Sequence, residues 1–106
     1  MAAFVVYTTD TSTVWQFSPV TDSNSAAPGT PISLTGATGA ELRFVPQSGA
    51  PYTGTGSVTI SASTVDYTPA PADLKPSARC EVQLSIQYGS ATRPMQPVVF
   101  QIIEAL

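Results

Sequence analysis

The sequence contains no histidine, one cysteine (Cys80) and only four lysine and arginine residues among 106 positions. Without histidine, a His-dependent catalytic triad is excluded, and one cysteine builds neither a disulfide framework nor a structural zinc site. The net charge of −3 and the few cations exclude a phosphate-binding surface, so we expect no nucleic-acid partner. We also expect no cofactor, no metal ion, no catalytic residues and no enzymatic activity.

Charged residues and long apolar runs are also scarce. Charged residues form 10% of the chain, against about 25% in an average globular protein, which excludes a coiled coil, a long helix bundle and a highly charged disordered tail. No run approaches the roughly 20 apolar residues of a membrane span, so we expect no membrane partner. The apolar run at residues 4–6 has no basic region before it and does not look like a secretory signal.

Apolar residues make up 42% of the chain, which is enough for the core of one compact domain. The clearest pattern lies between Cys80 and Tyr88, where apolar and polar residues alternate and Leu84 lies on the apolar face. This alternation predicts a half-buried β-strand. It also predicts that Cys80 is a buried, inert thiol.

Shorter runs with strand character lie on both sides of this segment, at residues 4–8, 13–17, 41–45, 58–60, 65–67 and 98–103. Turn-forming clusters separate them at residues 21–31, 35–39, 47–56 and 69–76. Seven short strands with this spacing indicate an all-β sandwich or barrel. The one helical turn that we expect lies at residues 70–74, with Pro71 at its start and Pro76 ending it.

The last run, 98–103, is apolar on both faces, because Val99 and Ile103 lie opposite the face that carries Phe100. We therefore expect a strand that is either covered on both faces or exposed at the edge of a sheet. The sparse charge of the surface also indicates that much of it is covered in an assembly.

The sequence offers residues for two kinds of ligand or substrate site. The carboxylate pairs Asp66 with Asp73 and Glu41 with Glu81 are candidates for acid–base chemistry, but their neighbours in sequence predict a solvated surface. Asp73 also fits a role in capping the turn after Pro69.

Aromatic residues offer the second alternative, a carbohydrate-binding module at a cell surface with Trp15 and Tyr52 as stacking residues. Trp15 shares a strand face with Phe17, which favours the core. Tyr52 lies among proline, glycine and threonine and is the aromatic residue that we expect to be exposed.

Several segments also form a pattern along the chain. They are Thr9-Asp10-Thr11, residues 31–38 with the motif Leu34-Thr35-Gly36-Ala37-Thr38, Phe44, Tyr67 with Pro69, Asp73-Leu74, Tyr88-Gly89, Thr92, Pro94 and the run 98–103. In this pattern nearly the whole chain resembles the immunoglobulin-like domain at the N-terminus of tailed-phage baseplate upper proteins and related small phage virion proteins. Thr9 stands where that family has glycine.

The resemblance implies a single domain over residues 1–106, an immunoglobulin-like antiparallel β-sandwich of about seven strands. Structural roles in turns or core are expected for Trp15, Leu34, Gly36, Phe44, Tyr67, Pro69, Leu84 and Gly89. Tyr67 is expected to pack under the turn at Pro69 with its hydroxyl bonded to backbone, as corner tyrosines do in such sandwiches.

The resemblance further implies a non-enzymatic structural component of a tailed-phage virion, made in the host bacterial cytoplasm. It would act as capsid cement or decoration, or as an adaptor in the tail or baseplate. The receptor-binding portions of long baseplate proteins are missing from the sequence, which favours the capsid.

Expected partners are the major capsid protein or tail and baseplate proteins, together with further copies of the chain. A trimer would suit a capsid three-fold position. The candidate partner contacts are Phe4, Val5, Tyr52, Val99 and Ile103, with the segments 21–31 and 47–56. Residues 1–7 are expected to form either a strand or an arm that holds a partner.

Overall fold

The computed structural model describes residues 4–20, 30 and 32–104. Their elements are β1 (Phe4–Tyr7), β2 (Trp15–Phe17), β3 (Gly39–Pro46), β4 (Tyr52–Thr53), β5 (Ser57–Ile60), β6 (Val65–Thr68), the 3-10 helix η1 (Pro71–Asp73), β7 (Ser77–Tyr88), β8 (Ala91–Pro94) and β9 (Val98–Ile103). None of the helical structure in these ranges is long and apolar enough to span a membrane.

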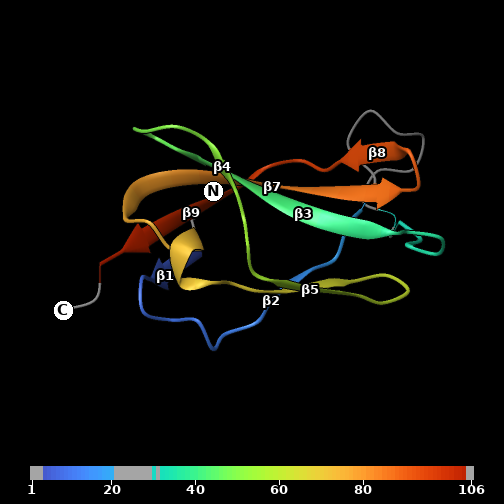
Figure 1. Ribbon diagram of the computed structural model, residues 1–106, viewed down its shortest axis with the longest axis horizontal. Coiled ribbons are helices and arrows are strands. Elements are labelled where there is room, and N and C mark those ends of the chain that lie inside the picture. Colours follow the sequence, from blue (N-terminus) through green and yellow to red (C-terminus); the bar gives the residue numbers. More distant parts are fainter. Residues whose placement is uncertain (1–3, 21–29, 31, 105–106) are drawn as a thin grey trace.

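The strands form two sheets that pack against each other (Figure 1). The larger has the order β1-β9-β7-β3-β4 with β8 beside β7, and the smaller has the order β2-β6-β5. Their connections follow an immunoglobulin-type sandwich, in which β2, β6 and β5 take the places of strands B, E and D, and β3, β7 and β9 those of C, F and G. The predicted all-β sandwich is thus confirmed.

The central strand of the larger sheet is β7, which extends the predicted strand at 80–88 to Ser77–Tyr88. It pairs antiparallel with β3 on one side and with β8 and β9 on the other. The predicted half-buried strand is confirmed: Glu81, on the polar face, is exposed, and the buried residues of the apolar face are Cys80, Val82, Leu84 and Ile86.

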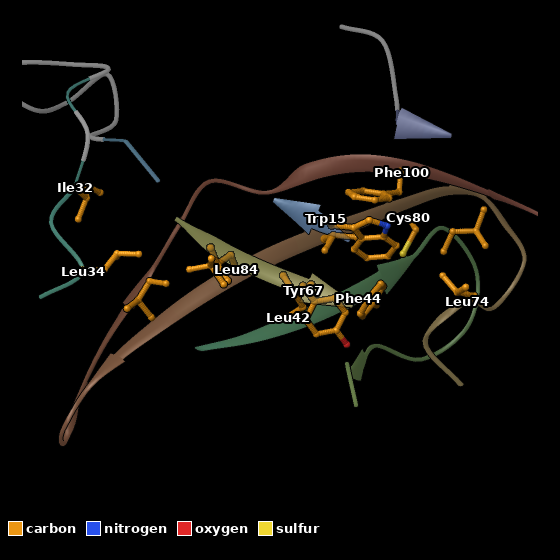
Figure 2. Packing of buried hydrophobic residues seen from close by; sticks show 14 residues of the cluster. Trp15, Ile32, Leu34, Leu42, Phe44, Tyr67, Leu74, Cys80, Leu84 and Phe100 are labelled. Atoms are coloured by element: carbon orange, nitrogen blue, oxygen red, sulfur yellow. The ribbon is translucent and has the colours of Figure 1, made fainter. Parts of the chain in front are cut away.

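Trp15 occupies the centre of the core between the sheets (Figure 2). The centroid of its ring lies 4.8 Å from that of Phe100, 5.7 Å from that of Tyr67 and 6.2 Å from that of Phe44. Tilted aromatic pairs at such distances add stability beyond their buried area. The core positions expected from the sequence are buried as predicted: Trp15, Leu34, Phe44, Tyr67, Pro69 and Leu84.

Three described glycines have backbone conformations that other residues rarely adopt, and two of them, Gly36 and Gly89, were assigned structural roles from the sequence. Gly36 has a φ of 87° and Gly89 a φ of 63°, both in the left-handed region that glycine enters without steric cost. Gly89 turns the chain from β7 into β8, so the expected turn after Tyr88 is confirmed.

The described residues form nine strands, where about seven were expected for the whole chain. The first addition, β4, lies inside the segment 47–56 that was predicted to be a turn, and the second is β8. Two residues are too few for β4 to show a periodicity, and all four residues of β8 are exposed, so neither gives an alternating pattern.

The last strand, β9, lies inside the larger sheet between β1 and β7. The interpretation of this run as an exposed edge is therefore wrong, and its outward residues Val99 and Ile103 are half-buried. The edge position belongs to β1, which pairs in parallel with β9 from Phe4 to Tyr7. Within these four residues the N-terminal segment is a strand rather than an arm.

Candidate functional site

A buried carboxylate, Asp73, organises the corner between β6 and β7. It is 1% exposed and ends η1. Its Oδ1 accepts a hydrogen bond from the backbone N–H of Thr55 at 2.8 Å, and its Oδ2 accepts one from the backbone N–H of Ala70 at 3.0 Å. The hydroxyl of Tyr67 also bonds to Oδ2. The predicted capping role of Asp73 is confirmed, whereas the predicted solvated position is wrong, because a loop distant in sequence covers the carboxylate.

Tyr67 links this carboxylate to the loop between β4 and β5. Its hydroxyl accepts a hydrogen bond from the backbone N–H of Gly56 at 2.8 Å, which confirms the expected bond to backbone. A Cβ at Gly56 would lie 2.1 Å from the carbonyl oxygen of Thr68, so the loop approaches this closely only with glycine there. Burial, followed by the bond to Asp73, raises the pKa of Tyr67 above its usual range.

Tyr52 belongs to the same corner and is half-buried, so the prediction that it is exposed is wrong. Its ring stacks on that of Phe44 with centroids 5.0 Å apart, and Lys75 Nζ lies 4.2 Å from its centroid. Its hydroxyl donates to the carbonyl of Asp73 at 2.9 Å. The register of β4 against β3 places Tyr52 opposite Phe44, and the short β4 gave no sign of this pairing. With Trp15 in the core, both proposed sugar-stacking residues are occupied by contacts within the chain.

Alkaline titration tests the packing of Tyr52. Burial raises its pKa to about 12 from an ordinary 10.0, so the folded state favours the neutral phenol. The free energy that the buried, neutral Tyr52 phenol contributes to folding is therefore fully present below pH 10 and is lost as the pH rises toward 12. We expect the free energy of unfolding in urea to fall over this range and to fall less steeply in Tyr52→Phe. The matched change Tyr7→Phe, on the exposed part of β1, is the control. Equal slopes for wild type and Tyr52→Phe would contradict the prediction.

An apolar groove of about 640 Å³ lies beside β2. Apolar side chains dominate its walls, with contributions from Phe4, Val5, Val6, Trp15, Phe17, Val20, Ile32, Met95, Val98 and Phe100. In the described part of the chain β2 pairs only with β6, and no residue of β5 or β6 lines the groove. In an immunoglobulin-type sandwich strand A lies beside strand B, but here the first strand pairs with β9 in the other sheet.

The strand β1 pairs only with β9 among the described residues, and its other edge borders this groove. Phe4 is 60% exposed, Val5 53% and Tyr7 51%, and the ring of Phe4 lies over that of Phe100 at 5.5 Å. Among the proposed partner contacts, Phe4 and Val5 thus lie on an exposed edge, while Val99, Ile103 and Tyr52 are half-buried. The proposed contact segment 21–31 lies outside the described residues except for Thr30.

The remaining candidate groups are not gathered into a site. Glu41 and Glu81 are exposed as expected, and Asp66 accepts a hydrogen bond from Gln16 Nε2 at 3.2 Å. The thiol of Cys80 is buried as predicted, and burial raises its pKa. Residues 4–20, 30 and 32–104 contain no cluster of three or more side chains suited to hold a metal ion.

Comparison of the chain with models of protein families, with curated proteins and with solved structures finds no match.

Proposed function

We propose that the chain is a non-enzymatic structural component of a tailed-phage virion. Its immunoglobulin-like domain would bind other virion proteins and copies of itself, as cement or decoration on the capsid or as an adaptor in the tail or baseplate. The observation that supports this best is the edge of β1, which no second strand of the described residues covers and where Phe4, Val5 and Tyr7 are each more than half exposed beside an apolar groove.

Edges of this kind are normally protected. Natural sheets carry lysine, proline or a bulge on an edge strand, because unpaired N–H and C=O groups otherwise recruit a strand from another molecule. The strand β1 consists of Phe-Val-Val-Tyr and carries none of these residues. A strand left open in this way suits a protein whose edge is covered by a partner through strand pairing and docking.

The sparse charge of the chain supports the same conclusion. A free monomer depends on surface charge for colloidal stability, and this chain has only 10% charged residues. A protein that spends its functional life packed against neighbours does not need that protection. The capsid exterior and the tail are both compatible with this feature.

Quantitative mass spectrometry of purified virions tests the proposal by counting this chain relative to the major capsid protein. A ratio near one, or a simple fraction of it, is expected for cement or decoration, and a handful of copies for the neck, tail or baseplate. A non-structural protein of the same phage provides the background level. A count at that background would overturn the proposal and direct the search to glycan binding.

A further inference from the structure

We infer that the groove between β1 and β2 is the contact surface for a second copy of this chain, related to the first by a two-fold axis. This inference rests on the proposed function, since it names the partner of the same exposed face.

The lining of the groove leaves apolar side chains in water. Phe4, whose ring lies over that of Phe100, and Val20 both line the groove and are 60% and 46% exposed. The molecule measures 44 × 26 × 23 Å, so a long face offers room for the roughly 800 Å² per partner that a stable interface buries. Exposed apolar patches of this kind mark interaction surfaces.

The two ends of the groove carry opposite charges. Asp10 follows β1 at the end where Ile102 of β9 pairs with Ser77 of β7. Arg93 lies on β8 opposite Ile86, farther along β7. Ile86 lies nine positions after Ser77 on β7, which corresponds to about 30 Å. Figure 1 shows the same arrangement, with the loop after β1 and the strand β8 toward opposite ends of the molecule.

Neither charged group has an ion-pair partner among the described residues, although both oxygens of Asp10 accept hydrogen bonds from its own loop. Thr13 donates to Asp10 from its hydroxyl and lowers the pKa of that carboxyl, so Asp10 is ionised at neutral pH. Arg93 is exposed, and the ion pair found among the described residues joins Arg79 to Glu81 instead.

These charges select one orientation of the pair. A two-fold axis that lies in the interface and crosses the groove at right angles places Arg93 of each copy on Asp10 of the other, as an isologous contact requires. An axis along the groove would place Arg93 on Arg93 and Asp10 on Asp10, and like charges facing each other oppose association.

The first arrangement also brings the apolar residues together at the axis. Val98 pairs with Val82, and Phe100, the partner of Phe4, pairs with Cys80. Cys80 and Val82 lie about midway along β7 between Ser77 and Ile86. Phe4 and Val98 lie beside these two positions in the sheet, so Phe4 and Val98 of the two copies would meet near the axis. A central apolar cluster with charges toward the rim is the usual anatomy of a protein interface.

Sedimentation equilibrium and native mass spectrometry of the full chain test the inference. Wild type is expected to be a dimer, and Arg93→Glu and Asp10→Arg are each expected to raise the dissociation constant about tenfold or more. An equimolar mixture of the two variants should recover the dimer as a mixed pair, because each unlike contact is then complementary. Arg43→Glu, an exposed change on β3 outside the groove, is the matched control and should remain dimeric.

Asp10→Arg could lose the dimer by disturbing the turn that Asp10 forms with Thr13, so a further variant tests the interface away from this turn. Phe4→Ser, with folding verified by circular dichroism, is expected to be monomeric because it removes the side chain nearest the axis. A monomeric or trimeric wild type would overturn the inference, as would an Arg93→Glu variant as dimeric as Arg43→Glu. A monomer that is abundant in virions would contradict only this inference, whereas a dimer absent from virions would contradict only the proposed function.

Discussion

Tyr67→Ala is expected to lower the free energy of unfolding by about 3 kcal/mol or more, as large aromatic truncations in protein cores do. The side chain is 1% exposed and its ring lies 5.7 Å from that of Trp15. Its removal leaves a cavity between the sheets and also removes the hydroxyl that joins Gly56 to Asp73. Because a small domain is stable by only about 5–15 kcal/mol, the loss should be evident in urea unfolding.

Two matched variants separate the parts of this effect. Tyr67→Phe keeps the ring and removes the hydroxyl, so it should cost about 1–3 kcal/mol through the unsatisfied N–H of Gly56 and the lost bond to Asp73. Tyr7→Ala truncates an exposed tyrosine and should change stability far less. An unchanged melting curve for Tyr67→Ala would remove this residue from the core.

Asp73→Ala is expected to lower the free energy of unfolding by about 3 kcal/mol or more, although the substitution removes a polar group from the interior. The substitution leaves the N–H groups of Thr55 and Ala70 and the hydroxyl of Tyr67 without their acceptor. Each buried donor left in this way costs about 1–3 kcal/mol. The loop between β4 and β5 should then separate from the corner, which hydrogen exchange at Thr55 would detect.

The control for this prediction is Asp66→Ala, since Asp66 is half-buried on the neighbouring β6 and bonds to Gln16. Its removal should cost little. A double-mutant cycle between Asp73→Asn and Tyr67→Phe should give a coupling energy of about 1 kcal/mol, because the two groups share one hydrogen bond. Equal losses for Asp73→Ala and Asp66→Ala would show that the corner network adds nothing to stability.

The sequence was sufficient to predict the parts of the fold that depend on periodicity. Alternation at 80–88 identified β7, and the pattern around Leu42 and Phe44 identified β3. The core position of Trp15 also followed from its strand face. These positions are determined by local pattern, since a strand with one apolar face must bury that face.

Contacts between distant segments were not predictable in the same way. The burial of Asp73 depends on a loop eighteen residues earlier in the chain, at Thr55, and the packing of Tyr52 depends on a two-residue strand. The groove was not predicted either, because it exists only where β1 pairs with β9 rather than with β2. The local sequence of β1 does not determine which of the two edges it joins.

The parallel pairing of β1 with β9 has a mechanical consequence. Phe4 lies level with Phe100 and Tyr7 with Ile103, so a force that pulls on the start of β1 and the end of β9 slides the two strands along each other. The evenly spaced bonds of a parallel ladder then bear the load together, instead of opening one after another as at the end of a hairpin. Resistance to force depends on the unfolding barrier rather than on equilibrium stability. A force applied in this way to β1 and β9 is therefore expected to meet more resistance than one that opens a hairpin from its end.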